Sequence, residues 1–109
     1  MIKVSIFYPA GPETRFNHDY YENVHIPMAI DLLGVAVKSV SVERGISPGS
    51  PWPDPAYIAL AHFVIESKAA YEAALFPHLA QLQGDLVNYS NVEPMFQFSE
   101  ITLEQVVET

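Results

Sequence analysis

Two side chains with acid–base chemistry, Tyr21 and His25, stand four residues apart near the start of the chain. On a helix, residues i and i+4 are neighbours on one face, so the phenol and the imidazole can touch. A neutral imidazole both donates and accepts a hydrogen bond, and it titrates near physiological pH. In an apolar cavity, His25 could move a proton on a phenol, a quinone or an enol. The structural alternative is that the pair only fixes the local shape of the helix.

The segment that carries this pair, residues 17–34, has the signals of a helix with a disturbed middle. Asn17 is a good N-cap, because its side-chain oxygen can accept from a free backbone N–H, and Gly34 supplies a stop. Pro27 lacks an N–H and disfavours helical geometry at Ile26, so we expect a kink just after His25 and a freed carbonyl near the imidazole. At about 100° per residue, the predicted buried face consists of His18, Tyr21, Val24, His25, Met28 and Leu32.

Five further residues are candidates for contact with a ligand, each with a structural alternative. His18 stands in the first helical turn and could equally be a surface or cap residue. Met28 shares the predicted buried face with His25. Trp52 could form a lid, or it could be exposed or packed in a dimer. The remaining two lie in predicted strands: His62 could face a pocket or a dimer interface, and Phe96 could be a core residue.

The spacing of the histidines does not predict a metal site. His18 and His25 are two helical turns apart, about 10 Å along the axis, which is too far to bind one ion together. A site would need His25 together with His62 or His78 from another element. The sequence also lacks a nicotinamide or flavin fingerprint and a serine nucleophile elbow. We therefore expect neither a metal nor a cofactor.

Composition limits the classes of function. The 109 residues suit one domain, residues 1–109. Hydrophobic residues make up 50% and charged residues only 17% of the chain, against roughly 25% charged residues in ordinary domains. A small domain with so few charges is expected to self-associate. Acidic residues outnumber basic residues by 13 to five, so no basic footprint for nucleic acid exists. Without an apolar run long enough for a membrane span, we expect a cytoplasmic protein that binds no membrane.

Hydrophobic patterning predicts the order strand–helix–strand–strand–helix–strand. The predicted strands are Ile2–Tyr8, Val35–Arg44, Tyr57–Ile65 buried on both faces, and Met95–Leu103. The apolar positions of Val35–Arg44 change parity around Lys38 and Ser39, which predicts a bulge or a strand with both faces partly covered. The second helix is Lys68–Leu86, capped by Ser67 and restarted at Pro77. This order predicts an α+β fold, the ferredoxin-like βαββαβ arrangement with a four-stranded antiparallel sheet. Both helices must cover one face, so the other apolar face predicts a homodimer through packed sheet faces.

Two segments resemble a known family. His18-Asp-Tyr-Tyr-Glu-Asn-Val-His-Ile-Pro-Met28 is similar to the opening helix of the EthD family, in the dimeric α+β barrel superfamily, and residues 84–100 resemble its closing motif. The resemblance covers nearly the whole chain and implies a dimeric α+β barrel with a ligand pocket between the sheet and the helices of each subunit. It puts Tyr21, His25 and Pro27 on the helix motif, and Asn88, Tyr89, Pro94 and Gln97 on the closing motif. Asn88 and Gln97 are expected to hold backbone or to cross the interface.

Two classes of function remain open. In the first, the protein is a cofactor-independent catabolic or biosynthetic enzyme in which His25, helped by Tyr21, carries out proton transfer or oxygenation on a small aromatic or polyketide-like compound. Burial among apolar residues would keep the imidazole neutral and able to act as a base. In the second, the same pocket belongs to a non-catalytic binding protein or an accessory subunit of a degradation pathway.

Overall fold

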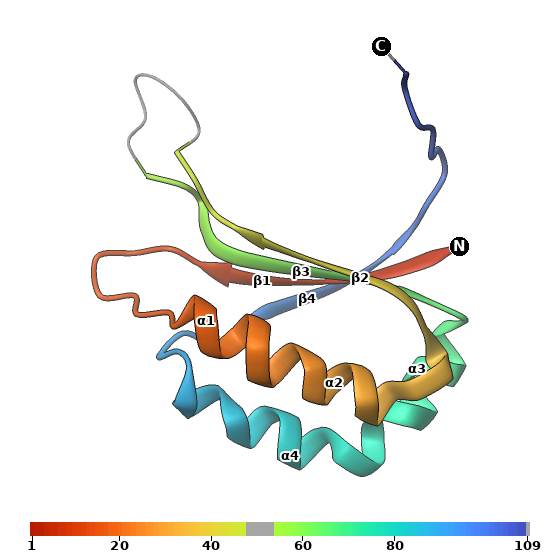
Figure 1. The fold of residues 1–109 in the computed structure, drawn as a ribbon, viewed down its shortest axis with the longest axis horizontal. Coiled ribbons are helices and arrows are strands. Elements are labelled where there is room, and N and C mark those ends of the chain that lie inside the picture. The colour runs from red at the N-terminus through yellow and green to blue at the C-terminus, as the bar shows by residue number, and fades with distance from the viewer. Residues whose placement is uncertain (48–53, 109) are drawn as a thin grey trace.

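The chain folds into a four-stranded antiparallel sheet with its helices on one face (Figure 1). The computed structural model describes residues 1–47 and 54–108. The strands are β1 (Ile2–Pro9), β2 (Val37–Arg44), β3 (Tyr57–Ile65) and β4 (Met95–Glu100), in the spatial order β2-β3-β1-β4. The helical segments are α1 (His18–Tyr20), η1 (Tyr21–His25), α2 (Ile26–Leu33), η2 (Gly34–Ala36), α3 (Lys68–Leu75), η3 (Phe76–His78), α4 (Leu79–Gly84) and η4 (Asp85–Asn88). The predicted ferredoxin-like α+β fold is confirmed.

The two central strands supply the floor of the core. Val4 of β1 lies opposite Phe63 of β3, and both side chains are buried against the helices. Residues of the other parity, such as Leu60 and Val64, point to the opposite face and are only partly buried. The prediction that Tyr57–Ile65 is buried on both faces is therefore not met within a single chain, because the helices cover only one side of the sheet.

The edge strand β2 begins two residues later than predicted. A 3₁₀ turn, η2, precedes it and leaves Val35 92% exposed. The predicted bulge is confirmed, since the pairing of β2 with β3 shifts register between Val37 and Ser39. That shift brings Val40 and Val42 onto the helix-covered face. At the other edge, β4 ends at Glu100, and the chain then leaves the sheet on the side away from the helices (Figure 1).

The first helix does not break at Pro27, contrary to the prediction. Ile26 keeps helical angles, φ −64° and ψ −45°, and α2 runs on to Leu33. Pro27 falls in the first turn of α2, where a missing N–H is tolerated. The irregularity lies one turn earlier, in η1, a π-helical turn closed by the Ile26 N–H donating to the Tyr21 carbonyl. Gly34 ends the helix with a positive φ of 57°, as predicted.

The second helical layer is segmented. The Ser67 hydroxyl accepts from the Ala70 N–H and caps α3, as predicted. The helix restarts around Pro77, which lies in the short η3 turn between α3 and α4. A last 3₁₀ turn, η4, continues to Asn88. Within the part of the chain that the structure describes, no helix has the length and apolar character needed to cross a membrane.

Gly45 is predicted to be essential to the β2–β3 hairpin. A Cβ at this position would lie 1.9 Å from the Tyr57 carbonyl oxygen. The backbone would have to move, so we expect Gly45→Ala to lower the free energy of unfolding by about 1–3 kcal/mol. Gly84→Ala is the matched control: it meets open space in a helix and should raise stability by about 0.5–1 kcal/mol. Chemical denaturation measures both, and an equal response would contradict the prediction.

Candidate functional site

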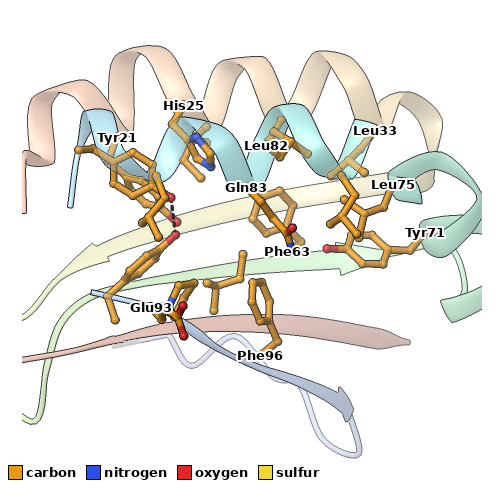
Figure 2. Close-up of a pocket in the computed structure, with 18 residues that line it drawn as sticks. Tyr21, His25, Leu33, Phe63, Tyr71, Leu75, Leu82, Gln83, Glu93 and Phe96 are labelled. Atoms are coloured by element: carbon orange, nitrogen blue, oxygen red, sulfur yellow. Dashed lines mark hydrogen bonds between the residues drawn. The ribbon is translucent and has the colours of Figure 1, made fainter. Parts of the chain in front are cut away.

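A pocket of about 410 Å³ lies between the helix-covered face of the sheet and the helices (Figure 2). A volume of this size suits a drug-sized organic ligand. Most of the wall is aliphatic or aromatic, with a few polar groups among the lining residues: Ile6, Tyr8, Tyr21, His25, Ile26, Ala29, Leu33, Phe63, Tyr71, Leu75, Leu79, Leu82, Gln83, Leu86, Tyr89, Glu93, Pro94 and Phe96.

The π turn η1 delivers both predicted catalytic candidates to this pocket. Tyr21 is 0% and His25 8% exposed, and their rings stack with centroids 5.4 Å apart and planes 13° from parallel. The predicted contact at i and i+4 is confirmed. It is a stacking contact, however, and the hydrogen-bond partner of the imidazole lies on another element.

The same turn corrects the predicted buried face of the helix. A π turn holds one more residue than an α turn. Each residue after the turn therefore faces the direction that the residue before it would face in an uninterrupted α-helix. The buried residues of α2 are Ile26, Ala29 and Leu33, whereas Met28 and Leu32, which were predicted to be buried, are only partly buried. Val24, predicted to be buried, is 46% exposed because it lies on the outer side of the wide turn.

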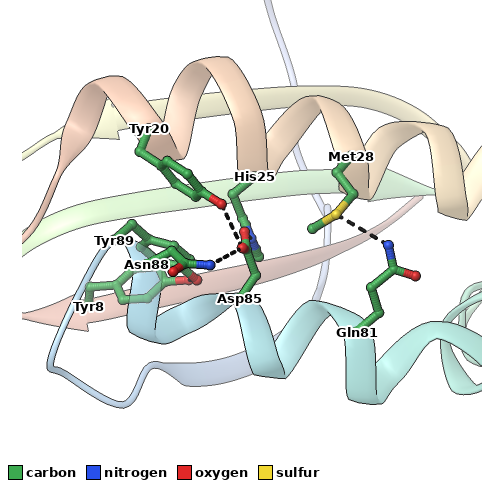
Figure 3. A network of polar contacts seen from close by, with 8 residues as sticks. All are labelled: Tyr8, Tyr20, His25, Met28, Gln81, Asp85, Asn88 and Tyr89. Carbon is green, nitrogen blue, oxygen red and sulfur yellow. Dashed lines mark hydrogen bonds and ion pairs between the residues drawn. The ribbon is translucent and has the colours of Figure 1, made fainter.

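Asp85 is the partner of the imidazole. Its Oδ2 lies 2.9 Å from Nδ1 of His25, and both side chains are almost fully buried. The other carboxylate oxygen accepts from the Tyr20 hydroxyl at 2.7 Å and from the Asn88 amide at 2.9 Å (Figure 3). A carboxylate only accepts, so Nδ1 carries the proton and Nε2 of the neutral ring is left as the basic nitrogen. Burial raises the pKa of Asp85, but the three hydrogen bonds outweigh it, and the net pKa is lowered.

Sequence reasoning missed Asp85, which it placed only within residues 84–100, the segment that resembles the closing motif. The residue is 60 positions from His25 in the chain, so no local spacing links the two. Its place in the closing motif, just after Gly84, was the only available signal. Asn88 was expected to hold backbone or cross an interface; it donates instead to the Asp85 side chain.

Two tyrosine rings, those of Tyr21 and Tyr89, contact the imidazole, and the Tyr8 ring packs against both of them. The hydroxyls of Tyr8 and Tyr89 are hydrogen-bonded at 2.8 Å, and the Tyr89 ring centroid lies 4.6 Å from that of His25. The Tyr21 hydroxyl is buried and has no hydrogen-bond partner among the residues that the structure describes. Burial raises the pKa of all three phenols, so they remain neutral near physiological pH.

The other predicted ligand contacts separate into three groups. Phe96 lines the pocket at its β4 side (Figure 2). Neither His18 nor Met28 lines it: His18 packs on Phe16 with ring centroids 4.9 Å apart, and the Met28 sulfur accepts from Gln81 between α2 and α4 (Figure 3). The prediction for Trp52 lies outside the described residues.

His62 lies on the opposite face of the sheet from the pocket. Its Nδ1 is 2.8 Å from the Ser5 hydroxyl, and its Nε2 is 3.7 Å from the Glu43 carboxylate. Strand alternation places it there, because Ala61 and Phe63 on either side face the helices. The ligand-binding prediction for His62 is therefore wrong for this pocket, and the residue belongs to the face that the helices leave uncovered.

No group of three or more metal-binding side chains gathers anywhere in residues 1–47 and 54–108. The His25–Asp85 pair brings two such side chains together, and the other polar groups beside it are tyrosine hydroxyls and an amide. This arrangement suits proton transfer to and from an imidazole better than the binding of an ion.

The fold and the pocket define a ferredoxin-like α+β protein with a site between sheet and helices. The chain belongs to the EthD domain family, whose model matches residues 13–92. It is similar to the crystal structure of an EthD-like protein from Ralstonia eutropha JMP134, with 36% identity, a TM-score of 0.91 and coverage of 95% of this chain and 94% of that chain.

Two more distant structures share the fold. An EthD family protein from Bacillus halodurans C-125 is 15% identical, with a TM-score of 0.66 over 93% of this chain and 99% of that chain. A dimeric ferredoxin-like protein from Thermobifida fusca YX is 9% identical, with a TM-score of 0.56 over 92% and 90%. No curated protein matches the chain.

Replacement of Asp85 is expected to change acid stability. Asp85→Asn should lower the free energy of unfolding at neutral pH by about 1–3 kcal/mol, because an amide cannot accept from all three donors. With its lowered pKa, the native carboxylate contributes stability above the unfolded pKa of about 4, and this contribution is lost as the pH falls through the folded value. The variant should show a smaller loss on acidification, measured by denaturation across pH.

Asp31→Asn is the matched control for this experiment. Asp31 is exposed on α2 and makes none of the hydrogen bonds described for Asp85. It should keep the native pH profile. Identical acid profiles for Asp85→Asn and the native protein would contradict the role assigned to the Asp85 carboxylate.

Proposed function

We propose that the protein is a cofactor-independent enzyme in which His25, oriented by Asp85, moves a proton on a small aromatic or polyketide-like compound. The observation that carries the proposal is the 2.9 Å hydrogen bond between Nδ1 of His25 and Asp85, made in the wall of an apolar pocket. Because Nδ1 is occupied, Nε2 is the nitrogen available to a ligand. Tyr21 supports the imidazole through stacking.

The proposed step is a reversible proton transfer. Nε2 removes a proton from an acidic O–H or C–H of the bound compound, which leaves a phenolate or enolate and an imidazolium. The Asp85 carboxylate stabilises that imidazolium and holds the ring in place, as carboxylates do in catalytic pairs of this kind. The imidazolium then returns its proton to the ligand at the same or another atom. Oxygenation would need dioxygen as a co-reactant of the deprotonated ligand and stays a prediction from the sequence.

The pocket favours an uncharged ligand. Among the described residues, no Lys or Arg lines it, and the chain carries a net charge of −8. A phosphate or a nucleotide would find no cation there, whereas aromatic and aliphatic walls suit an apolar ring system.

The predictions that the protein binds no nucleic acid and is cytoplasmic remain predictions.

A non-catalytic role is the second candidate, and one observation favours it. The hydrogen bonds of Asp85 with Tyr20, His25 and Asn88 tie the first helix to the end of the second helical layer. Such a cluster could serve only to hold the two layers together around a bound compound. The protein would then be a small-molecule binding protein or an accessory subunit.

We also propose that two copies pair through the sheet faces that the helices leave uncovered. Phe7 lies on this face and packs on Tyr57 with ring centroids 5.2 Å apart, and Leu60 and Val64 of β3 point the same way. These side chains are only partly buried in a single chain. A cluster of this kind in a small domain favours an interface, and the Thermobifida fusca protein of the same fold is described as dimeric.

The dimer prediction can be tested by light scattering. The native protein should have twice the chain mass of 12.1 kDa at micromolar concentration. Phe7→Glu should give a monomer, because a carboxylate would be buried unpaired in the interface. Phe76→Glu is the control, because Phe76 lies on the helical side and is 60% exposed. This variant should stay dimeric. A native mass of one chain would overturn the prediction.

His25 can be tested with two substitutions that separate binding from chemistry. A panel of uncharged aromatic and polyketide-like ketones is incubated with the protein in deuterated water, and NMR follows the loss of acidic C–H protons. We expect His25→Gln to keep ligand affinity, because the amide can still donate to Asp85, and to slow exchange by about a hundredfold or more. His25→Ala should lose exchange and also weaken binding.

His78→Gln is the control, because His78 lies in η3 and does not line the pocket. It should exchange protons at the native rate. If neither His25 variant folds, the imidazole is a structural clamp. Native exchange rates in both His25 variants would place the proton transfer at another residue. Native binding without exchange would favour the accessory role.

A further inference from the structure

The end of the pocket away from His25 carries a second polar side chain that the proposed chemistry does not use. Tyr71 of α3 is 6% exposed and lines the pocket. Its hydroxyl makes no hydrogen bond within residues 1–47 and 54–108. Figure 2 shows the phenol oxygen directed toward the middle of the pocket. Among the described residues it is the Tyr21 hydroxyl that is fully buried without a partner, whereas the Tyr71 hydroxyl opens onto the pocket, where a polar atom of a bound compound can reach it.

Gln83 of α4 reaches into the same part of the pocket (Figure 2). Gln83 is an exposed residue, and its amide has no hydrogen-bond partner among the described residues and does not bond to Tyr71. An amide and a phenol together can donate to and accept from one oxygen atom. Two elements of the second helical layer thus converge on one position with unused hydrogen-bonding capacity.

The space between the two polar ends is apolar. Ile26, Phe63 and Leu82 line it, from a helix, the sheet and the opposite helix. The length follows from the first helix, because His25 and Leu33 are eight residues apart, which is about 12 Å along its axis. Leu33 lines the pocket at the same end as Tyr71 in Figure 2. An elongated apolar body therefore fits, with one polar atom at each end.

We propose that the pocket selects an elongated, uncharged aromatic ligand with an oxygen at both ends. One oxygen-bearing end of the ligand lies beside Nε2 of His25 and is the end that reacts. The placement of this end rests on the proposed function. The other oxygen binds between the Tyr71 hydroxyl and the Gln83 amide. Tyr71 is thus a specificity residue, which fixes the direction of the ligand without taking part in the proton transfer.

The test compares two probes of equal apolar size, biphenyl with one para hydroxyl and biphenyl with a para hydroxyl on each ring. Isothermal titration should show that the native protein binds the second probe about tenfold more tightly. Tyr71→Phe should bring the two affinities together without weakening the single-hydroxyl probe. It should leave the melting temperature of the free protein nearly unchanged, because the hydroxyl that is removed opens onto the pocket. Gln83→Leu should reduce the preference in the same direction.

Tyr57→Phe is the matched control, because Tyr57 lies on the opposite face of the sheet and should keep the tenfold preference. Equal affinities in the native protein, or an unchanged preference in Tyr71→Phe, would overturn the two-ended ligand while leaving the His25 chemistry standing. Binding of neither probe would also overturn it. A preference that depends on Tyr71, without proton exchange at His25, would support the second anchor and overturn the proposed chemistry.

Discussion

The hydrogen bond between His25 and Asp85 is the contact on which the arrangement of the site depends. It joins the first helix to the end of the second helical layer, two elements 60 residues apart in the chain. The carboxylate is buried and accepts from three donors, so it stays ionised and holds the imidazole in one tautomer. One interaction thereby holds the two helical layers together beside the pocket and leaves Nε2 as the free ring nitrogen.

The sheet separates two environments that serve different ends. On the helix-covered face, β1 and β3 contribute Tyr8 and Phe63 to the floor of the pocket. On the other face, the same strands present Phe7 and His62, which no helix covers. Strand alternation makes this division unavoidable, because neighbouring residues point to opposite sides. The proposed ligand site and the proposed dimer face can therefore share two strands without competing for side chains.

Local chemistry was enough to predict most of the fold. The cap at Ser67, the stop at Gly34 and the bulge near Ser39 each depend on a few neighbouring residues, and each is confirmed. The π turn was not foreseen, because Pro27 by itself favours a kink. The π turn lies one turn before Pro27, and Pro27 itself is accommodated in the first turn of α2. Tyr21 and His25, at the two ends of the π turn, are both buried.

The order of elements and the α+β class could be predicted from the residues alone, because periodicity and turn residues act over short distances. The family resemblance rested on two motif segments, residues 18–28 and 84–100. The sequence also identified Tyr21 and His25, which are neighbours on one helix. The folded chain was needed to show that Asp85 is the partner of the imidazole and that Tyr71 lies at the other end of the pocket. Contacts between elements far apart in the chain depend on how the helices pack over the sheet, and no spacing along the sequence records them.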